Sequence, residues 1–296
     1  MATAVLIVNY RAYDALRRCL VSVSPHLSAD DEIVVVDYES DSGALAAAIA
    51  GIRAVSIVAR HDNRGFAAGV NLAAAQSRAR FMLLLNPDTI VEGPVVRVLE
   101  DWLTSHSEVA VAGARVLNVD GTVQPTARRF PGMTTLLGGR STWLTGRFPR
   151  NWFSRRNLVG LSAVSPIHVD WVSGACLMTR RDVFDAVGGF DESFFLYWED
   201  ADYCRRVAAA GLGCAYLPTA PVRHVGGASA QYDLPRAIRS FHRSAFRLYW
   251  KQTSLFGRLA APAVRIGLWL RGEWRVRQAL RRQRLTASRR NDPPTA

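Results

Sequence analysis

Continuous runs of apolar residues alternate with amphipathic stretches over the first part of the chain. Two runs, AVLIVNY at residues 4–10 and EIVVVDY at residues 32–38, are separated by a segment of helical periodicity at 12–23. A third run at 55–60 follows an alanine-rich segment at 45–50. Strands that are apolar on both faces are typical of a parallel sheet covered by helices on both sides. The pattern predicts a βαβαβ unit that opens an α/β domain.

The pattern continues with further strands and one long irregular segment. RFMLLLNPDT at 80–89 is expected to be a strand that ends in a polar turn, and RVLNVDGTVQPT at 115–126 a hairpin about Asp120-Gly121. VDWVSGACLMTR at 169–180 reads as one strand-like run. The stretch 130–166 is rich in Gly, Arg, Trp and Ser without periodicity, so we expect a long loop over a site, a candidate lid.

The C-terminal part differs from the rest in pattern and in charge. After Pro235 the periodicity is helical, and residues 236–290 hold 15 Arg or Lys against the single acid Glu273, a net +14. The whole chain carries +12, so the remainder is close to neutral. We predict a body at 1–230, a basic helical extension at 231–288 and a disordered tail at 289–296.

Cysteine spacing and the N-terminus bear on the compartment. The four cysteines show no C-x-x-C spacing, so we expect buried reduced thiols rather than a zinc cluster or a disulfide framework. The first apolar run is too short for a signal peptide and has no basic residues before it. We therefore expect a first strand there and a cytoplasmic protein.

Polar residues follow three of the predicted strands, at Asn9, Asp37 and Asn86-Pro87-Asp88. Ligands of open parallel sheets bind at the carboxyl ends of the strands. No Gly-x-Gly-x-x-Gly follows the first strand and no Gly-Lys-Ser/Thr occurs, which argues against dinucleotide and P-loop sites. The sequence indicates a nucleotide-binding sheet without a glycine cradle.

Acidic residues gather in FFLYWEDADYCRRV at 194–207. One interpretation is helix chemistry, since acids favour the N-terminal end of a helix. Another is sugar transfer from a nucleoside diphosphate, in which one carboxylate, here Asp200, deprotonates the acceptor hydroxyl. A divalent cation on Asp88 would stabilise the leaving diphosphate. Arg205 or Arg206, or the pair Arg180-Arg181, would supply a basic group for the phosphates, although each of these arginines also fits a surface position.

Several motifs then carry a family resemblance. In order, IVVVDYESDSG, NRGFAAGVNLA, LLLNPDT and VSGACLMTRRDVFDAVGGFDESFFLYWEDADYCRRVAAAGLGCAYLPTAPVRHVGGAS resemble the family 2 inverting glycosyltransferases of GT-A fold, especially bacterial rhamnosyltransferases. The match spans about residues 4–230. It implies a Rossmann-like nucleotide-binding sheet and transfer by single displacement.

The resemblance assigns roles to individual residues. Glu199 and Asp200 would be the catalytic pair, with the second acid, Asp200, as the base, while Asp88 and His224 would hold Mg²⁺ or Mn²⁺. Asp37 would contact the pyrimidine of the donor, and Asp191 and Glu192 would face the acceptor. The residues that we expect to bind substrate are Asn9, Asp37, Asn63, Gly65, Asn71, Asp191, Glu192, Trp171 and Arg205.

Two departures from the family pattern concern the donor site. Tyr38 and Glu39 replace the usual asparagine and small polar residue after the second-strand aspartate, which puts the contacts to the donor base in doubt. Asn86-Pro87-Asp88 has one carboxylate where many relatives have two, which suggests weaker metal binding. Asn-Pro-Asp is common in the rhamnosyltransferase-like branch and favours it.

The resemblance and the basic extension together predict the partners. We expect dTDP-L-rhamnose as donor, with UDP-sugars such as UDP-galactofuranose as the alternative, and a lipid-linked or glycolipid acceptor of cell-envelope polysaccharide synthesis. An arginine-rich extension with Trp269, Trp274, Leu268 and Leu270 suits the anionic inner face of the plasma membrane, although a merely solvated helix face is also open. A nucleic-acid-binding module or a noncatalytic nucleotide-sugar sensor is the alternative of another class. We expect no nucleic acid, because the acids near Asp200 would repel it.

Overall fold

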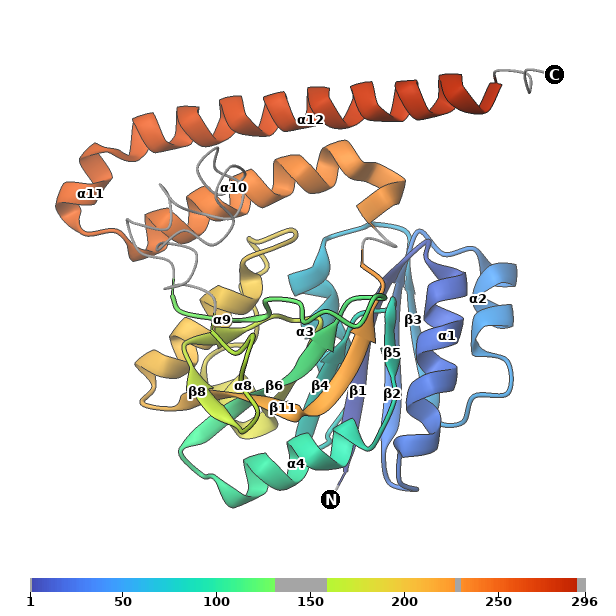
Figure 1. The fold of residues 1–296 in the computed structure, drawn as a ribbon. Coiled ribbons are helices and arrows are strands. Elements are labelled where there is room, and N and C mark those ends of the chain that lie inside the picture. Colours follow the sequence, from blue (N-terminus) through green and yellow to red (C-terminus); the bar gives the residue numbers. More distant parts are fainter. Residues whose placement is uncertain (1, 131–158, 227–229, 292–296) are drawn as a thin grey trace.

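The computed structural model describes residues 2–130, 159–226 and 230–291 (Figure 1). The strands are β1 (Thr3–Tyr10), β2 (Glu32–Tyr38), β3 (Val55–Arg60), β4 (Phe81–Leu85), β5 (Thr89–Val91), β6 (Val109–Leu117), β7 (Ala127–Arg128), β8 (Ile167–Val169), β9 (Trp171–Val172), β10 (Cys176–Arg180) and β11 (Gly213–His224). The helices are α1 (Tyr13–Val23), α2 (Ser42–Ile49), α3 (Phe66–Ala75), α4 (Val95–Ser105), α8 (Arg181–Ala186), α9 (Glu199–Ala209), α10 (Leu234–Gln252), α11 (Leu255–Leu259) and α12 (Ala261–Asn291). Short 3₁₀ turns lie at Ser24–His26 and Ala230–Asp233.

The main sheet has the order β3-β2-β1-β4-β10-β6-β11-β5, with β8 paired to β11. The first four strands of this order are parallel, which confirms the predicted βαβαβ opening. β10 runs antiparallel between β4 and β6, and β11 is parallel to β6. The carboxyl ends of β1, β2, β4 and β11 therefore meet at one edge of the sheet.

Both faces of the sheet are buried, which explains the continuous apolar runs. Along β1, Val5 and Ile7 belong to the core beneath α1, α2 and α4, whereas Leu6 and Val8 belong to the core beneath α3, α8 and α9. The side chains of a strand point alternately to opposite faces, so a strand buried on both faces must be apolar at every position. The four cysteines are buried and unpaired, as predicted.

The run at 169–180 is not the single strand predicted. It divides into the end of β8, then β9, a turn at Gly174 and finally β10. β9 pairs with β7 in a separate two-stranded sheet, whereas β10 enters the main sheet. The turn exposes the Gly174 N–H, which donates to the Asp200 carboxylate, so the break in the strand provides an anchor for that acid.

The predicted turn at Asp120-Gly121 is present. Gly121 has φ +81° and its N–H donates to Asn118 O at 3.0 Å, but the returning arm forms a single bridge, from Leu117 to Val123. Most of the proposed lid at 130–166 lies outside the described residues.

The C-terminal helices fold back as a hairpin above the carboxyl edge of the sheet (Figure 1). α10 and α12 are joined by α11 and held by a two-pronged ion pair from Arg239 to Glu273, at 2.7 and 2.9 Å. Gly272 lets α12 approach α10 closely, because a Cβ there would lie 3.1 Å from the His242 ring. α12 runs through Asn291 and so covers the first residues of the predicted tail. Within the described part of the chain, no helix is long and apolar enough to cross a membrane.

Candidate active site

A cavity of about 210 Å³ lies where the carboxyl ends of the strands meet the start of α10. Its walls come from the ends of β1, β2, β4 and β11, from the loop before α3, from the loop before α9 and from α10. The lining residues are Val8, Tyr10, Tyr38, Asn63, Gly65, Phe66, Asn86, Pro87, Asp88, Phe195, Leu196, Tyr197, His224, Asp233, Arg236 and Ala237. Of the residues predicted from sequence, Asp88, His224, Asn63 and Gly65 thus share one cavity.

Asp88 and His224 are in direct contact, although 136 positions separate them in the sequence. Asp88 Oδ1 lies 3.0 Å from His224 Nε2. The register of β11 against β5 places His224 opposite Thr89 and thereby brings these two side chains together. Both are shielded, with 6% of the Asp88 side chain and 15% of the His224 side chain exposed.

Two side-chain amides lie against the His224 ring and hold it in place. The Gln124 amide donates through Nε2 to the His224 carbonyl at 3.0 Å, so its Oε1, 3.1 Å from Nδ1, accepts the Nδ1 proton. Asn86 Nδ2 lies 3.3 Å from Nε2. An outer amide that orients a histidine in this way is a usual accompaniment of a metal ligand.

Asp88 and His224 could supply two of the ligands of a divalent cation. Adjacent ligands of an octahedral Mg²⁺ with bonds of about 2.1 Å lie about 3.0 Å apart, which is the separation seen here. Two lone-pair-bearing atoms at this distance also repel each other unless a cation or a proton lies between them. The described residues contain no cluster of three or more His, Cys, Asp or Glu that could hold an ion alone. Phosphate oxygens and water would have to complete the shell, as they commonly do for Mg²⁺.

Asn9 and Asp37 lie next to each other and are not among the residues that line the cavity. Asn9 Nδ2 donates to Asp37 Oδ1 at 2.7 Å, and the Tyr13 hydroxyl lies 3.3 Å from Asp37 Oδ2. Burial raises the pKa of Asp37, while the hydrogen bonds from Asn9, Ser40 and Tyr13 oppose the rise. Tyr38, the departure from the family pattern, lines the cavity itself.

Gly65 has a specific steric role at the entrance to α3. Its φ is +95°, and a Cβ would lie 2.2 Å from the Phe195 carbonyl oxygen. That oxygen accepts the Phe66 N–H at 2.7 Å, and Asn63 Oδ1 accepts the Gly65 N–H at 3.0 Å. Glycine is required because the backbone of the loop before α9 passes so close to residue 65 that a side chain would not fit.

Asn71 and the acidic pair of the GGFDE loop lie outside the cavity wall. Asn71 binds the Phe190 backbone through both ends of its amide, at 2.8 Å each, and so holds this loop against α3. Glu192 pairs with Arg64 at 2.8 Å, and Asp191 pairs with Lys251 of α10 at 2.9 Å. Burial would raise the pKa of Asp191, but the Ser193 and Lys251 hydrogen bonds outweigh it and lower the pKa to about 2. The assignment of Asp191 and Glu192 to the acceptor stays a prediction.

Glu199 and Asp200 begin α9 in contrasting settings. Asp200 accepts N–H groups from Gly174 at 3.1 Å and from Ala201 at 2.8 Å. Burial raises the pKa of Asp200, and these hydrogen bonds limit the rise. Glu199 is 5% exposed, and its Oε2 has no hydrogen-bond partner among the described residues. Burial, followed by the Asp200 charge, raises the pKa of Glu199 well above its ordinary value.

Asp200 is one residue removed from the cavity wall. A Cβ on Gly174 would lie 3.4 Å from the Phe66 ring and 4.0 Å from the Asp200 Cβ, so Gly174 separates the wall from the acid. Tyr197, two residues before Glu199, lines the cavity. Asp200 therefore lies beside the cavity, and its role as the base stays a prediction.

The backbone just before this acid pair is strained. Tyr197 and Trp198 have φ values of +69° and +71°, a left-handed conformation that costs a non-glycine residue roughly 1–2 kcal/mol. Such strain clusters at functional sites, where the surrounding structure enforces it. The pair of left-handed residues turns Tyr197 to the cavity and starts α9 at Glu199.

The remaining predicted residues have structural contacts. Trp171 is 5% exposed, donates through Nε1 to Arg129 O at 3.0 Å and packs 6.1 Å from the Trp198 ring. Arg205 is exposed and reaches Gln252 and the Phe130 ring, away from the cavity. Arg206 pairs with Asp202 at 2.9 Å. Arg181 binds backbone carbonyls at Ala74, Ser77 and Ala79.

Two residues of the site were not identified from the sequence. Gln124 lies in a loop arm that carries no recognisable motif, and only its contact with His224 reveals it. Arg236 lies in the basic extension, where it is one of many arginines, yet it lines the cavity. No sequence signal separates it from its neighbours.

With this geometry established, comparisons with known proteins identify the family. The family described as glycosyltransferase-like family 2 matches residues 2–254, and the chain belongs to it. A curated relative from Mycobacterium tuberculosis, N-acetylglucosaminyl-diphospho-decaprenol L-rhamnosyltransferase, is 29% identical over 294 residues, which are 95% of this chain and 94% of that protein. Rhamnosyltransferase WbbL of Escherichia coli is 24% identical over 84% of this chain and 90% of its own length.

Solved structures agree on the fold. A crystal structure of GalNAc-T7 with UDP, GalNAc and Mn²⁺ superposes with a TM-score of 0.57 at 15% identity, over 81% of this chain and 47% of that one. Mannosyltransferase PcManGT from Pyrobaculum calidifontis, in complex with GDP-Man and Mn²⁺, superposes with a TM-score of 0.56 at 14% identity, over 98% of this chain and 76% of that one. The chain therefore has the GT-A glycosyltransferase fold predicted from its motifs, and it is a transferase of this family.

The raised pKa of Glu199 predicts a specific pH dependence of stability. Below the ordinary glutamate pKa near 4.5 the group is neutral whether the chain is folded or unfolded. Above it the unfolded chain ionises first, so the free energy of unfolding falls by up to about 1.4 kcal/mol per pH unit until the raised folded pKa is reached. We expect Glu199→Gln to remove this decline, measured by urea unfolding at a series of pH values. Glu192→Gln, at an exposed ion-paired acid, is the control, and an unchanged pH profile for Glu199→Gln would contradict a neutral buried Glu199.

Proposed function

We propose that this glycosyltransferase transfers L-rhamnose from dTDP-L-rhamnose to a lipid-linked sugar diphosphate in cell-envelope polysaccharide synthesis. The observation that carries the proposal is the contact of Asp88 with His224 in a cavity that Asn63 and Gly65 also line. The M. tuberculosis and E. coli relatives, both rhamnosyltransferases, support the sugar, and the first of them supports the lipid-linked acceptor.

In the proposed reaction Asp200 takes the proton from the acceptor hydroxyl as its oxygen attacks the anomeric carbon. The bond from that carbon to the diphosphate breaks in the same displacement, so the configuration inverts. The two backbone N–H groups on Asp200 keep its carboxylate oriented, and its burial raises its basicity. The acceptor would approach beside Phe66, because Gly174 separates that ring from the acid.

Asp88 and His224 are the residues that would hold Mg²⁺ or Mn²⁺, with the donor phosphates completing the shell. When bound, the ion would neutralise charge on the leaving diphosphate. The Gln124 and Asn86 amides both contact the His224 ring, so both would preserve the geometry of the ligand pair.

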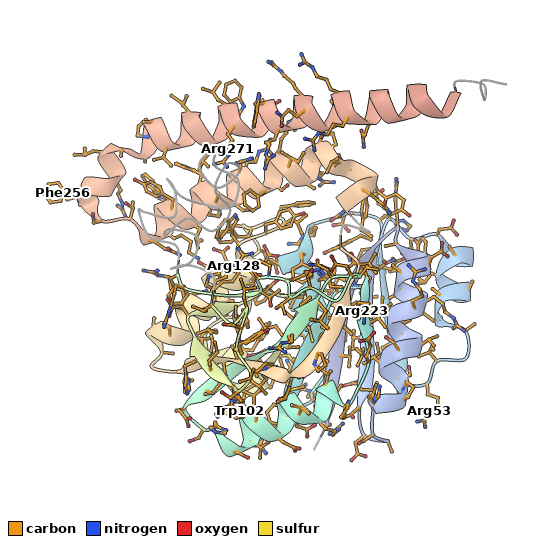
Figure 2. All side chains as sticks on the ribbon, in the orientation of Figure 1. Arg53, Trp102, Arg128, Arg223, Phe256 and Arg271 are labelled. Atoms are coloured by element: carbon orange, nitrogen blue, oxygen red, sulfur yellow. The ribbon has the colours of Figure 1, made fainter. Side chains whose placement is uncertain are left out.

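We also propose that the C-terminal hairpin binds the cytoplasmic surface of an anionic membrane. Leu255, Phe256 and Leu259 of α11 are 77–83% exposed, and Phe256 projects from the tip of the hairpin (Figure 2). On α12, Trp269, Leu270 and Trp274 are 54–62% exposed, whereas Leu268 is half-buried. Exposed apolar side chains among arginines match a lipid interface, because the arginines attract the anionic headgroups.

Neutralising the proposed base should separate catalysis from donor binding. We expect Asp200→Asn to lower kcat by at least about a hundredfold, the lower range for a general base, with donor affinity nearly unchanged. Steady-state kinetics and calorimetry with dTDP-L-rhamnose and a GlcNAc-diphospho-polyprenol would measure both, and Asp185→Asn on the exposed face of α8 is the matched control. A rate like that of the parent protein would remove Asp200 from this role.

Removal of the metal should abolish turnover reversibly. We expect EDTA to stop the reaction and Mn²⁺ or Mg²⁺ to restore it, and Asp88→Asn to require much higher metal concentrations because it loses the only carboxylate of the ligand pair. The measurement is the rate as a function of free metal. Full activity in EDTA would show that the pair acts without an ion.

Point variants of α11 should test membrane binding. Phe256→Glu should weaken binding to phosphatidylglycerol-containing vesicles by about tenfold or more, since it removes a large apolar group from the interface. Co-sedimentation measures this, and Val21→Glu on α1 adds the same charge elsewhere. Unchanged sedimentation of Phe256→Glu would contradict the proposed surface. Truncation after Pro235 is a poor substitute, because it also removes Arg236 and Ala237 from the cavity wall.

A further inference from the structure

The basic extension contributes directly to the wall of the donor cavity. Arg236 lies in the first turn of α10, after the helix cap Asp233, whose carboxylate accepts the Arg236 backbone N–H at 3.1 Å. Among the described residues that line the cavity, Arg236 is the only arginine or lysine. Asp88 and His224 line the same cavity.

The guanidinium of Arg236 is held in position by an aromatic ring. It stacks over the Phe195 ring, with its central carbon 4.1 Å from the ring centroid, and it forms no ion pair with any described residue. Phe195 is itself anchored, since its carbonyl accepts the Phe66 N–H where Gly65 permits close approach. An arginine held flat on an aromatic ring keeps its N–H donors at the rim of the plane, suited to phosphate oxygens.

Other groups that could bind phosphate near the cavity are already engaged. The first N–H groups at the entrance to α3 are used by Phe195 O and by Asn63 Oδ1. Arg64 pairs with Glu192 and Arg206 pairs with Asp202, and Arg181 is bound to backbone carbonyls. Among the described residues that line the cavity, a diphosphate would therefore meet one arginine or lysine, and that arginine has no ion pair.

We propose that Arg236 binds the diphosphate of the nucleotide-sugar donor in the cavity that Asp88 and His224 also line. The inference rests on the proposed function, because it requires a nucleoside diphosphate in this cavity. It gives the extension a second task besides membrane binding: α10 completes the donor site, so the site is whole only when the hairpin is docked on the body.

The test compares ligands that differ only in their phosphates. Calorimetry with dTDP, dTMP and thymidine, and with UDP, UMP and uridine, would be run on the full-length protein in EDTA and again with Mg²⁺. Arg236→Gln should weaken nucleoside diphosphate binding by about 10- to 100-fold, the usual range for a charge-assisted hydrogen bond, while nucleoside binding stays unchanged. Arg236→Lys keeps the charge but loses the planar guanidinium. Its affinity for nucleoside diphosphates should lie between those of the parent protein and Arg236→Gln.

Arg243→Gln is the matched control, because Arg243 is an exposed arginine two turns further along the same helix and outside the cavity. It should bind every ligand like the parent protein, and thermal unfolding would show that all three variants are folded. Equal diphosphate affinity for Arg236→Gln and the parent would overturn the proposal. An equal loss of affinity for thymidine and for dTDP would also overturn it, because Arg236 would then contact the nucleoside rather than the diphosphate. If the parent protein binds no nucleotide at all, the proposed donor itself is wrong, which is a separate outcome.

Discussion

The site depends on the pairing of β11 with β5 at the end of the sheet. This register sets His224 opposite Thr89 and so places its ring against Asp88. Neither residue is distinctive by itself, since a lone aspartate in a turn and a lone histidine at a strand end have many structural roles. Their contact is buried and oriented by Gln124, and it is the pair that we propose as part of a cation site.

The conformation of the loop before α9 is the second constraint, and it lowers the stability of the fold. Two consecutive left-handed residues, Tyr197 and Trp198, precede a buried glutamate whose Oε2 has no hydrogen-bond partner among the described residues. A chain optimised only for stability would avoid both features. They persist next to Asp200 because Gly65, Phe66 and the turn at Gly174 hold the loop in place.

The C-terminal hairpin links this site to the surface of the molecule. Lys251 of α10 pairs with Asp191 at 2.9 Å and also contacts Asp202 of α9, so the helix is tied to the acidic loop beneath it. Arg239 and Glu273 tie α12 to α10 in turn. The α11 surface that we propose to bind membrane is thus connected through α10 to the wall of the cavity.

Local patterns alone determined the layers of the fold and the edge that carries the site. Continuous apolar strands require cover on both faces, and the polar residues after β1, β2 and β4 mark the carboxyl edge, so the sheet and the neighbourhood of Asn9, Asp37 and Asp88 could be read directly. Tertiary structure decided which residues enter the cavity. Gln124 and Arg236 do so through contacts with distant segments, and Asn71 instead binds the Phe190 backbone. The physical reason is that local patterns report burial and propensity, whereas the direction of a polar side chain depends on what packs across from it.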